Sequence, residues 1–158
     1  NPALNLDIAQ TRTGRIKYGY VINLEQAMTD DIGLFSRWSW NDGKTEIMSF
    51  TDIDASLSMG ASIKGARWGR PDDVIGIGGA FNGLSRDHRD FIAAGGLGPL
   101  IGDGALNYRR ERVLESYYAL ALSKRFTLTA DYQLITNPAY NADRGPVHIF
   151  SGRLHGEF

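Results

Sequence analysis

The chain has 158 residues, a net charge of −1 and no cysteine. This length accommodates one ordinary domain, and the lack of cysteine excludes both a disulfide framework and cysteine metal sites. The near-neutral charge offers no basic surface for nucleic acid, so we expect no nucleic-acid partner. No stretch approaches about 18 consecutive apolar residues, which excludes a transmembrane helix.

Alternation of polar and apolar residues predicts an all-β chain with seven long strands. In chain order they are 16–27, 32–40, 54–66, 73–84, 112–124, 126–136 and 147–158. The third is the clearest, because every even position from 54 to 64 is polar or Gly and every odd position is apolar. The fourth is the weakest, because Gly76, Gly78 and Gly79 blur its phase.

Strand length favours a membrane. The alternation over 54–64 is about twice as long as an average soluble strand of about 5–6 residues. A tilted strand that crosses a bilayer needs about 9–11 residues. Aromatic residues are placed accordingly, with Trp38 and Trp40 near one end of the predicted strands and Phe126 and Phe158 near the other. The sequence therefore favours a transmembrane β-barrel with aromatic girdles.

The connections between the predicted strands alternate between short and long. The long ones, 41–53, 85–111 and 137–146, are predicted to be extracellular loops, because bacterial barrels have short periplasmic turns and longer outer loops. Within 85–111, the segment 86–94 is predicted to form one or two helical turns. The sequence leaves open whether this loop folds into the pore.

Charged side chains fall on one phase of the predicted strands, which we interpret as the lining of a water-filled pore. The candidate pore-lining residues are Lys17, Asn23, Glu25, Arg37, Lys64, Glu115, Asp131, Gln133, Arg153, His155 and Glu157. No catalytic, cofactor or metal site is expected, because the histidines lack metal-ligand spacing and there is no nucleotide-binding motif. A glycosidase pair of Glu115 and Asp131 is a weak alternative.

Seven strands are too few to close an open channel, which needs about 16–18. We therefore expect an antiparallel barrel of about sixteen strands, of which residues 1–158 form the C-terminal part.

Several segments resemble the carbohydrate-selective outer-membrane porins, typified by the glucose-selective porin. They are Asn23–Gln26, Gly33–Trp38, Lys64–Asp73, Glu115–Tyr118, Asp131–Pro138 and Arg153–Phe158. The resemblance implies a bacterial outer-membrane protein, not an enzyme, that admits monosaccharides by passive diffusion. It also implies a homotrimer, contact with outer-membrane lipid, and Phe158 as the insertion signal for the barrel-assembly machinery.

The sequence is also compatible with two other functions. The first is a non-selective or ion-conducting general porin of the same fold. The second is a soluble all-β carbohydrate-binding module, in which the charged phase would simply be an exposed sheet face.

Overall fold

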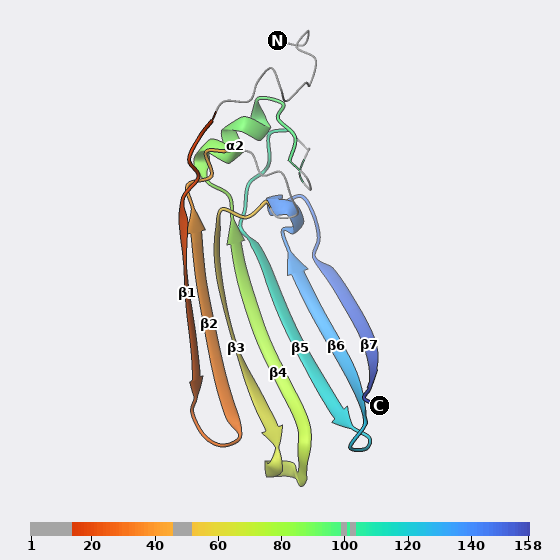
Figure 1. Ribbon diagram of the computed structural model, residues 1–158. Coiled ribbons are helices and arrows are strands. Elements are labelled where there is room, and N and C mark those ends of the chain that lie inside the picture. Colours follow the sequence, from red (N-terminus) through yellow and green to blue (C-terminus); the bar gives the residue numbers. More distant parts are fainter. Residues whose placement is uncertain (1–13, 46–51, 99–100, 102–103) are drawn as a thin grey trace.

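The computed structural model describes residues 14–45, 52–98, 101 and 104–158. Seven antiparallel strands form one sheet, in which each strand pairs with its neighbours in sequence (Figure 1). The strands are β1 (Gly19–Ala27), β2 (Ile32–Asn41), β3 (Ala55–Gly65), β4 (Arg70–Gly83), β5 (Glu111–Ala121), β6 (Phe126–Thr136) and β7 (Val147–Gly156). Within the described part of the chain, β1 and β7 each pair with one strand only, so this sheet has two free edges and is not closed.

All seven predicted strands are present, and β6 has the predicted bounds. The ends of the others differ by up to three residues. The prediction that β4 begins at residue 73 is wrong, because the turn before it is tighter than expected. The 3-10 turn η1 (Ala66–Trp68) and Gly69, with φ of 77°, reverse the chain within four residues. The predicted continuation of β5 to residue 124 is also wrong, because the Leu122 and Ser123 N–H groups donate to the Phe126 carbonyl and close a turn.

β4 was predicted to be the weakest strand, yet with 14 residues it is the longest. Two of its glycines, Gly76 and Gly78, do not leave holes, because aromatic side chains from other strands cover them. The ring of Tyr117 in β5 lies against Gly76, and the ring of Phe35 in β2 extends to Gly78. Such aromatic cover compensates for the packing that a glycine in a strand cannot supply.

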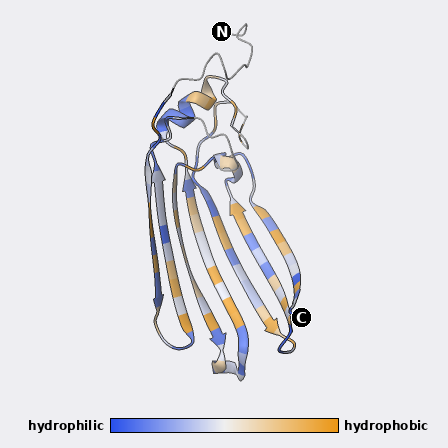
Figure 2. Cartoon of the chain, in the orientation of Figure 1, coloured by the Kyte–Doolittle hydropathy of each residue, from blue (hydrophilic) through white to orange (hydrophobic). Residues whose placement is uncertain are grey.

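Hydrophilic and hydrophobic residues alternate along much of the sheet (Figure 2), and the strand register assigns them to opposite faces. Residues that oppose each other across an antiparallel pair project to the same side. Ile22, Trp38, Leu57 and Phe81 form one row across four strands, and all four are apolar. We call their side the apolar face and the opposite side the polar face. The apolar side chains remain widely exposed, which is expected where hydrocarbon and not a second protein layer covers them.

Aromatic side chains pack together near both ends of the sheet. At the end that carries the long connections, Tyr20 lies 5.3 Å from Trp38 and 5.5 Å from Trp40, measured between ring centroids. At the opposite end, the rings of Phe126 and Phe158 lie 6.0 Å apart. The predicted aromatic residues thus gather at the two levels where a membrane-spanning barrel meets the headgroups.

The long connections lie together at one end of the sheet, the loop end, and the short turns lie at the other, the turn end (Figure 1). The loop end contains the helix α2 (Arg86–Ala93), as predicted, and the 3-10 turn η2 (Pro138–Tyr140). Leu84, Ile92, Ile101 and Tyr140 form a small buried core there.

None of the described helices is long and apolar enough to cross a bilayer.

Candidate pore-lining face

The strand register places the predicted polar residues on one face. Asn23 opposes Arg37, Glu115 opposes Gln133, and Lys64 is connected to Arg153 through a row of opposed pairs across β4, β5 and β6. The candidate residues within strands that share the polar face are Asn23, Glu25, Arg37, Lys64, Glu115, Asp131, Gln133, Arg153 and His155.

Two candidate residues lie outside the strands, so their predicted strand positions are wrong. Lys17 precedes β1, and its Nζ donates to the Thr45 carbonyl at 3.4 Å. Glu157 follows β7, and its Oε1 lies 3.3 Å from His155 Nε2. Both belong to the ends of the sheet, and their pore-lining role stays a prediction.

On β1 and β2 the polar side chains are connected by hydrogen bonds. The Arg37 Nε donates to Asn23 Oδ1 at 3.1 Å, and the Asn23 Nδ2 donates to Glu25 Oε1 at 3.2 Å. All three side chains are solvent-exposed. This row presents donors at one end and a carboxylate acceptor at the other, which suits hydroxyl groups that both donate and accept.

A second polar group lies on β5, β6 and β7. Glu115 and Asp131 interact electrostatically, so these two carboxyls approach each other as predicted. The Ser151 hydroxyl donates to Asp131 Oδ1 at 3.1 Å.

Among the described residues, no three His, Asp or Glu side chains gather in a way that would hold a metal ion.

Between these two polar groups, few side chains project from the polar face, because glycines occupy part of the connecting row. The row from Glu25 to Glu115 passes through Phe35, Gly60 and Gly78. A hollow of about 760 Å³ lies over this region, and most of its lining residues belong to the polar face. The polar face thus has charged side chains on both sides of a hollow central region.

The loop end is attached to the sheet through Asp54, which directly precedes β3 on the polar phase. Its Oδ2 accepts from the Ser85 N–H at 2.8 Å and lies 2.9 Å from His88 Nδ1. Burial alone would raise the pKa of the Asp54 carboxyl, but the contacts with His88 and Ser85 outweigh burial and lower this pKa below its ordinary value. Helix α2 is therefore held at the loop end by the Asp54 carboxylate, on the polar side of the sheet.

Tyr140 and Glu111 provide two further contacts between the loops and the residues at the loop end of the sheet. The Tyr140 hydroxyl donates to the Asp52 carbonyl at 2.6 Å. Burial, followed by the charges of Glu111, Asp52 and Asp54, raises the pKa of Tyr140, so its hydroxyl keeps the proton that it donates. Glu111, also on the polar face, accepts from the Ala139 N–H at 3.0 Å and from Asn82 Nδ2 at 3.2 Å.

A charged cluster at the turn end was not predicted. The side chain of Asp73 is 1% exposed and accepts from Arg70, from the Tyr118 hydroxyl, and from the Ala121 N–H at 2.9 Å. Trp68 Nε1 in turn donates to the Tyr118 hydroxyl at 3.1 Å. The cluster ties the β3–β4 turn to the end of β5 through Arg70 and Asp73.

Phe35 and Tyr117 are further polar-face residues that the list of candidates omitted. Both occupy the charged phase of their strands, which was the available signal. Their contacts with Gly60, Gly78 and Gly76 depend on register, which alternation alone does not specify.

Long antiparallel strands with one charged face and one apolar face, short turns at one end and long loops at the other, define the wall of a porin-type β-barrel. The chain belongs to the carbohydrate-selective porin, OprB family, whose family model matches residues 1–158. It is therefore part of a bacterial outer-membrane barrel. This family and fold are those of a transport channel, and they exclude the soluble carbohydrate-binding module considered above.

One solved structure, described as the high-pH structure of Pseudomonas putida OprB, has a similar fold with a TM-score of 0.63 and 20% sequence identity. The match covers 89% of this chain and 34% of that chain, so residues 1–158 span about a third of that protein's length. A comparison with curated proteins found no match.

Proposed function

We propose that the chain forms part of a water-filled pore through which monosaccharides such as glucose diffuse across the outer membrane. The observation that carries this proposal is the polar face that the seven strands share, on which Asn23, Glu25 and Arg37 form one polar group and Glu115 and Asp131 belong to another. Family membership supports the carbohydrate substrate. The proposed transport is passive diffusion, as the resemblance to carbohydrate-selective porins implies.

The proposal requires a closed barrel. The free edges of β1 and β7 have unpaired backbone groups, which a membrane does not tolerate unless further strands pair with them. We infer a complete barrel of about sixteen strands, with the loop end outside the cell and the turn end in the periplasm. Insertion directed by Phe158 and assembly into a homotrimer stay predictions, which deletion of Phe158 and cross-linking of the protein in detergent would test.

Swelling of proteoliposomes that contain the complete barrel tests the substrate. We expect faster swelling in glucose than in a zwitterion of similar size, because hydroxyls bond to both acidic and basic side chains of the polar face. Equal rates for the two solutes would instead support the general porin. An absence of swelling in both would overturn the pore itself.

A pair of neighbouring substitutions tests which face meets lipid. Ala61 lies on the apolar face and Ser62 on the polar face of the same strand. Ala61→Arg should impair insertion, because an arginine facing the middle of the bilayer costs about 2–4 kcal/mol. Ser62→Arg should insert normally and change the ionic conductance. The yield of heat-modifiable folded protein in outer membranes measures the first effect; equal yields for both variants would contradict the assignment of the faces.

A further inference from the structure

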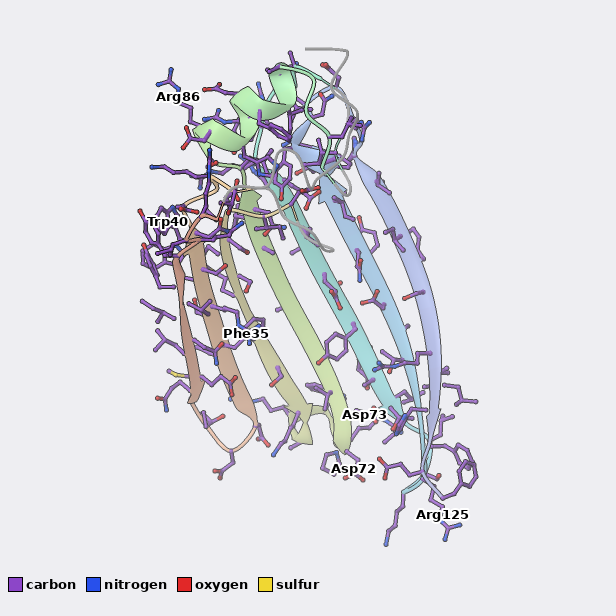
Figure 3. The ribbon with its side chains drawn as sticks, turned by 45° about the horizontal axis from the view of Figure 1, so that its top comes forward. Phe35, Trp40, Asp72, Asp73, Arg86 and Arg125 are labelled. Carbon is purple, nitrogen blue, oxygen red and sulfur yellow. The ribbon has the colours of Figure 1, made fainter. Side chains whose placement is uncertain are left out.

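Phe35 lies flat on the polar face. It opposes Glu25 in β1 and Gly60 in β3. A Cβ atom built on Gly60 would lie 2.5 Å from Phe35 Cε1, and one built on Gly78 would lie 3.7 Å from Phe35 Cζ. The ring therefore rests on the backbone of β3 and reaches β4 (Figure 3). Because the side chain is still 43% exposed, one face of the ring is open to the polar side.

Tyr117 repeats this arrangement from the opposite direction. It opposes Gly76 of β4, and a Cβ atom built there would lie 2.1 Å from Tyr117 Cε1 and 2.7 Å from the hydroxyl oxygen. The outer part of the Tyr117 ring thus occupies the space that a larger residue at position 76 would take. Gly76 and Gly78 are two residues apart on β4, a distance of about 7 Å. The rings of Tyr117 and Phe35 therefore lie over neighbouring positions of the same strand.

The borders of this aromatic surface are polar. Glu25, bonded to Asn23, lies beside Phe35, and Glu115 lies beyond Gly78 on the same row. The hollow of about 760 Å³ includes Glu25, Phe35, Gly78, Glu115 and Tyr117 in its lining. A sugar ring has an apolar face of C–H groups and a rim of hydroxyls. The arrangement offers an aromatic floor for the first and carboxylate acceptors for the second.

We propose that Phe35 and Tyr117, held flat by Gly60, Gly78 and Gly76, form a stacking surface for the ring face of a monosaccharide, with Glu25 and Glu115 bonding to its hydroxyls. This inference rests on the pore function proposed above and names a contact site within it. The two rings bind the solute weakly and release it, as a passive pore requires.

Sugar block of ionic current through single channels of the complete barrel tests the stacking surface. Glucose and sorbitol are the probes, because sorbitol has hydroxyls but no ring face. In the unmodified protein we expect half-block at a lower concentration of glucose than of sorbitol. Phe35→Ala and Phe35→Leu should each raise the half-blocking glucose concentration by about three- to tenfold and leave sorbitol unchanged. Phe35→Tyr should retain the block by glucose.

Tyr117→Ala provides a second route to the same result if a Phe35 variant folds poorly, and Leu24→Ala on the apolar face is the control that should leave block unchanged. Equal glucose block in the unmodified protein, Phe35→Leu and Tyr117→Ala would overturn the stacking surface alone. Conductance without any block by glucose would overturn both the stacking surface and the sugar preference, and an absence of conductance would overturn the pore.

Discussion

The two ends of the sheet each contain a buried carboxylate, but they hold it in different ways. At the loop end Asp54 faces His88 and lies next to a small hydrophobic core. At the turn end Asp73 faces Arg70 and Tyr118, and its cluster includes no buried apolar residue. Asp54 precedes β3 on the polar phase, whereas Tyr118, the partner of Asp73, lies on the apolar face.

This difference concerns how each end of the sheet is held together. The loop end has its own core, so its loops are held by burial and by the contacts of Asp54 with Ser85 and His88. The turn end has no such buried core among the described residues, and its carboxylate is held by hydrogen bonds and by an ion pair with Arg70, a side chain that stays charged. We therefore expect the loop end to loosen independently of the sheet, while the turn end behaves as part of the sheet. Three substitutions test this expectation, in order of decreasing effect.

The largest effect is expected from Ile92→Ala. Ile92 is 0% exposed and belongs to the core of the loop end. Truncating a buried isoleucine costs about 2–5 kcal/mol, and here the cost falls on the docking of α2 and not on strand pairing. Limited proteolysis should therefore show faster cleavage within 85–111, while the barrel keeps its heat-modifiable folded form.

The matched control is Ile77→Ala, which truncates the same residue type on the apolar face of β4, where Ile77 is 50% exposed. It should leave the cleavage rate within 85–111 unchanged. If Ile92→Ala instead unfolded the whole barrel, the loop end would not be an independent unit.

A smaller effect is expected from Asp54→Ala, which removes the carboxylate that binds Ser85 and His88. Losing hydrogen bonds to a buried charged group costs about 1–3 kcal/mol. Because the pKa of Asp54 is lowered in the folded protein, its contribution is present above the unfolded-state pKa of about 4 and is lost as pH falls through the folded-state value. Cleavage within 85–111 by an acid-active protease should rise in this acidic range.

Asp54→Ala should remove the part of this acid response that comes from position 54. The other titratable groups beside it are His88, Asp52 and Tyr140, and they remain in the variant. An acid response of unchanged size in Asp54→Ala would show that the Asp54 carboxylate does not hold α2.

Alternation predicted most of the fold because it is a local property. The strands and their two faces follow from a period of two residues, which needs no knowledge of distant contacts. For the same reason alternation did not find the site details that depend on register. Asp73 and Tyr118 are 45 residues apart in sequence, and His88 and Asp54 are 34 apart. Gly76 and Gly78 of β4 misled the prediction, because the rings of Tyr117 and Phe35 that cover them come from other strands.

The smallest effect is expected from Tyr118→Phe at the turn end. The variant loses the hydroxyl that donates to Asp73 and accepts from Trp68 Nε1, at a net cost of about 1 kcal/mol. Arg70 and the Ala121 N–H still bind Asp73, so the cluster should persist. Because this end behaves as part of the sheet, the loss should appear as a lower unfolding temperature of the whole barrel in detergent, with cleavage within 85–111 unchanged. Tyr132→Phe is the matched control on the same face, since its hydroxyl lies 2.9 Å from the exposed His148, and its removal should shift the unfolding temperature less. Equal shifts for the two variants would show that the Asp73 cluster adds nothing beyond an exposed hydrogen bond, and the contrast between the two ends would then rest on the hydrophobic core of the loop end alone.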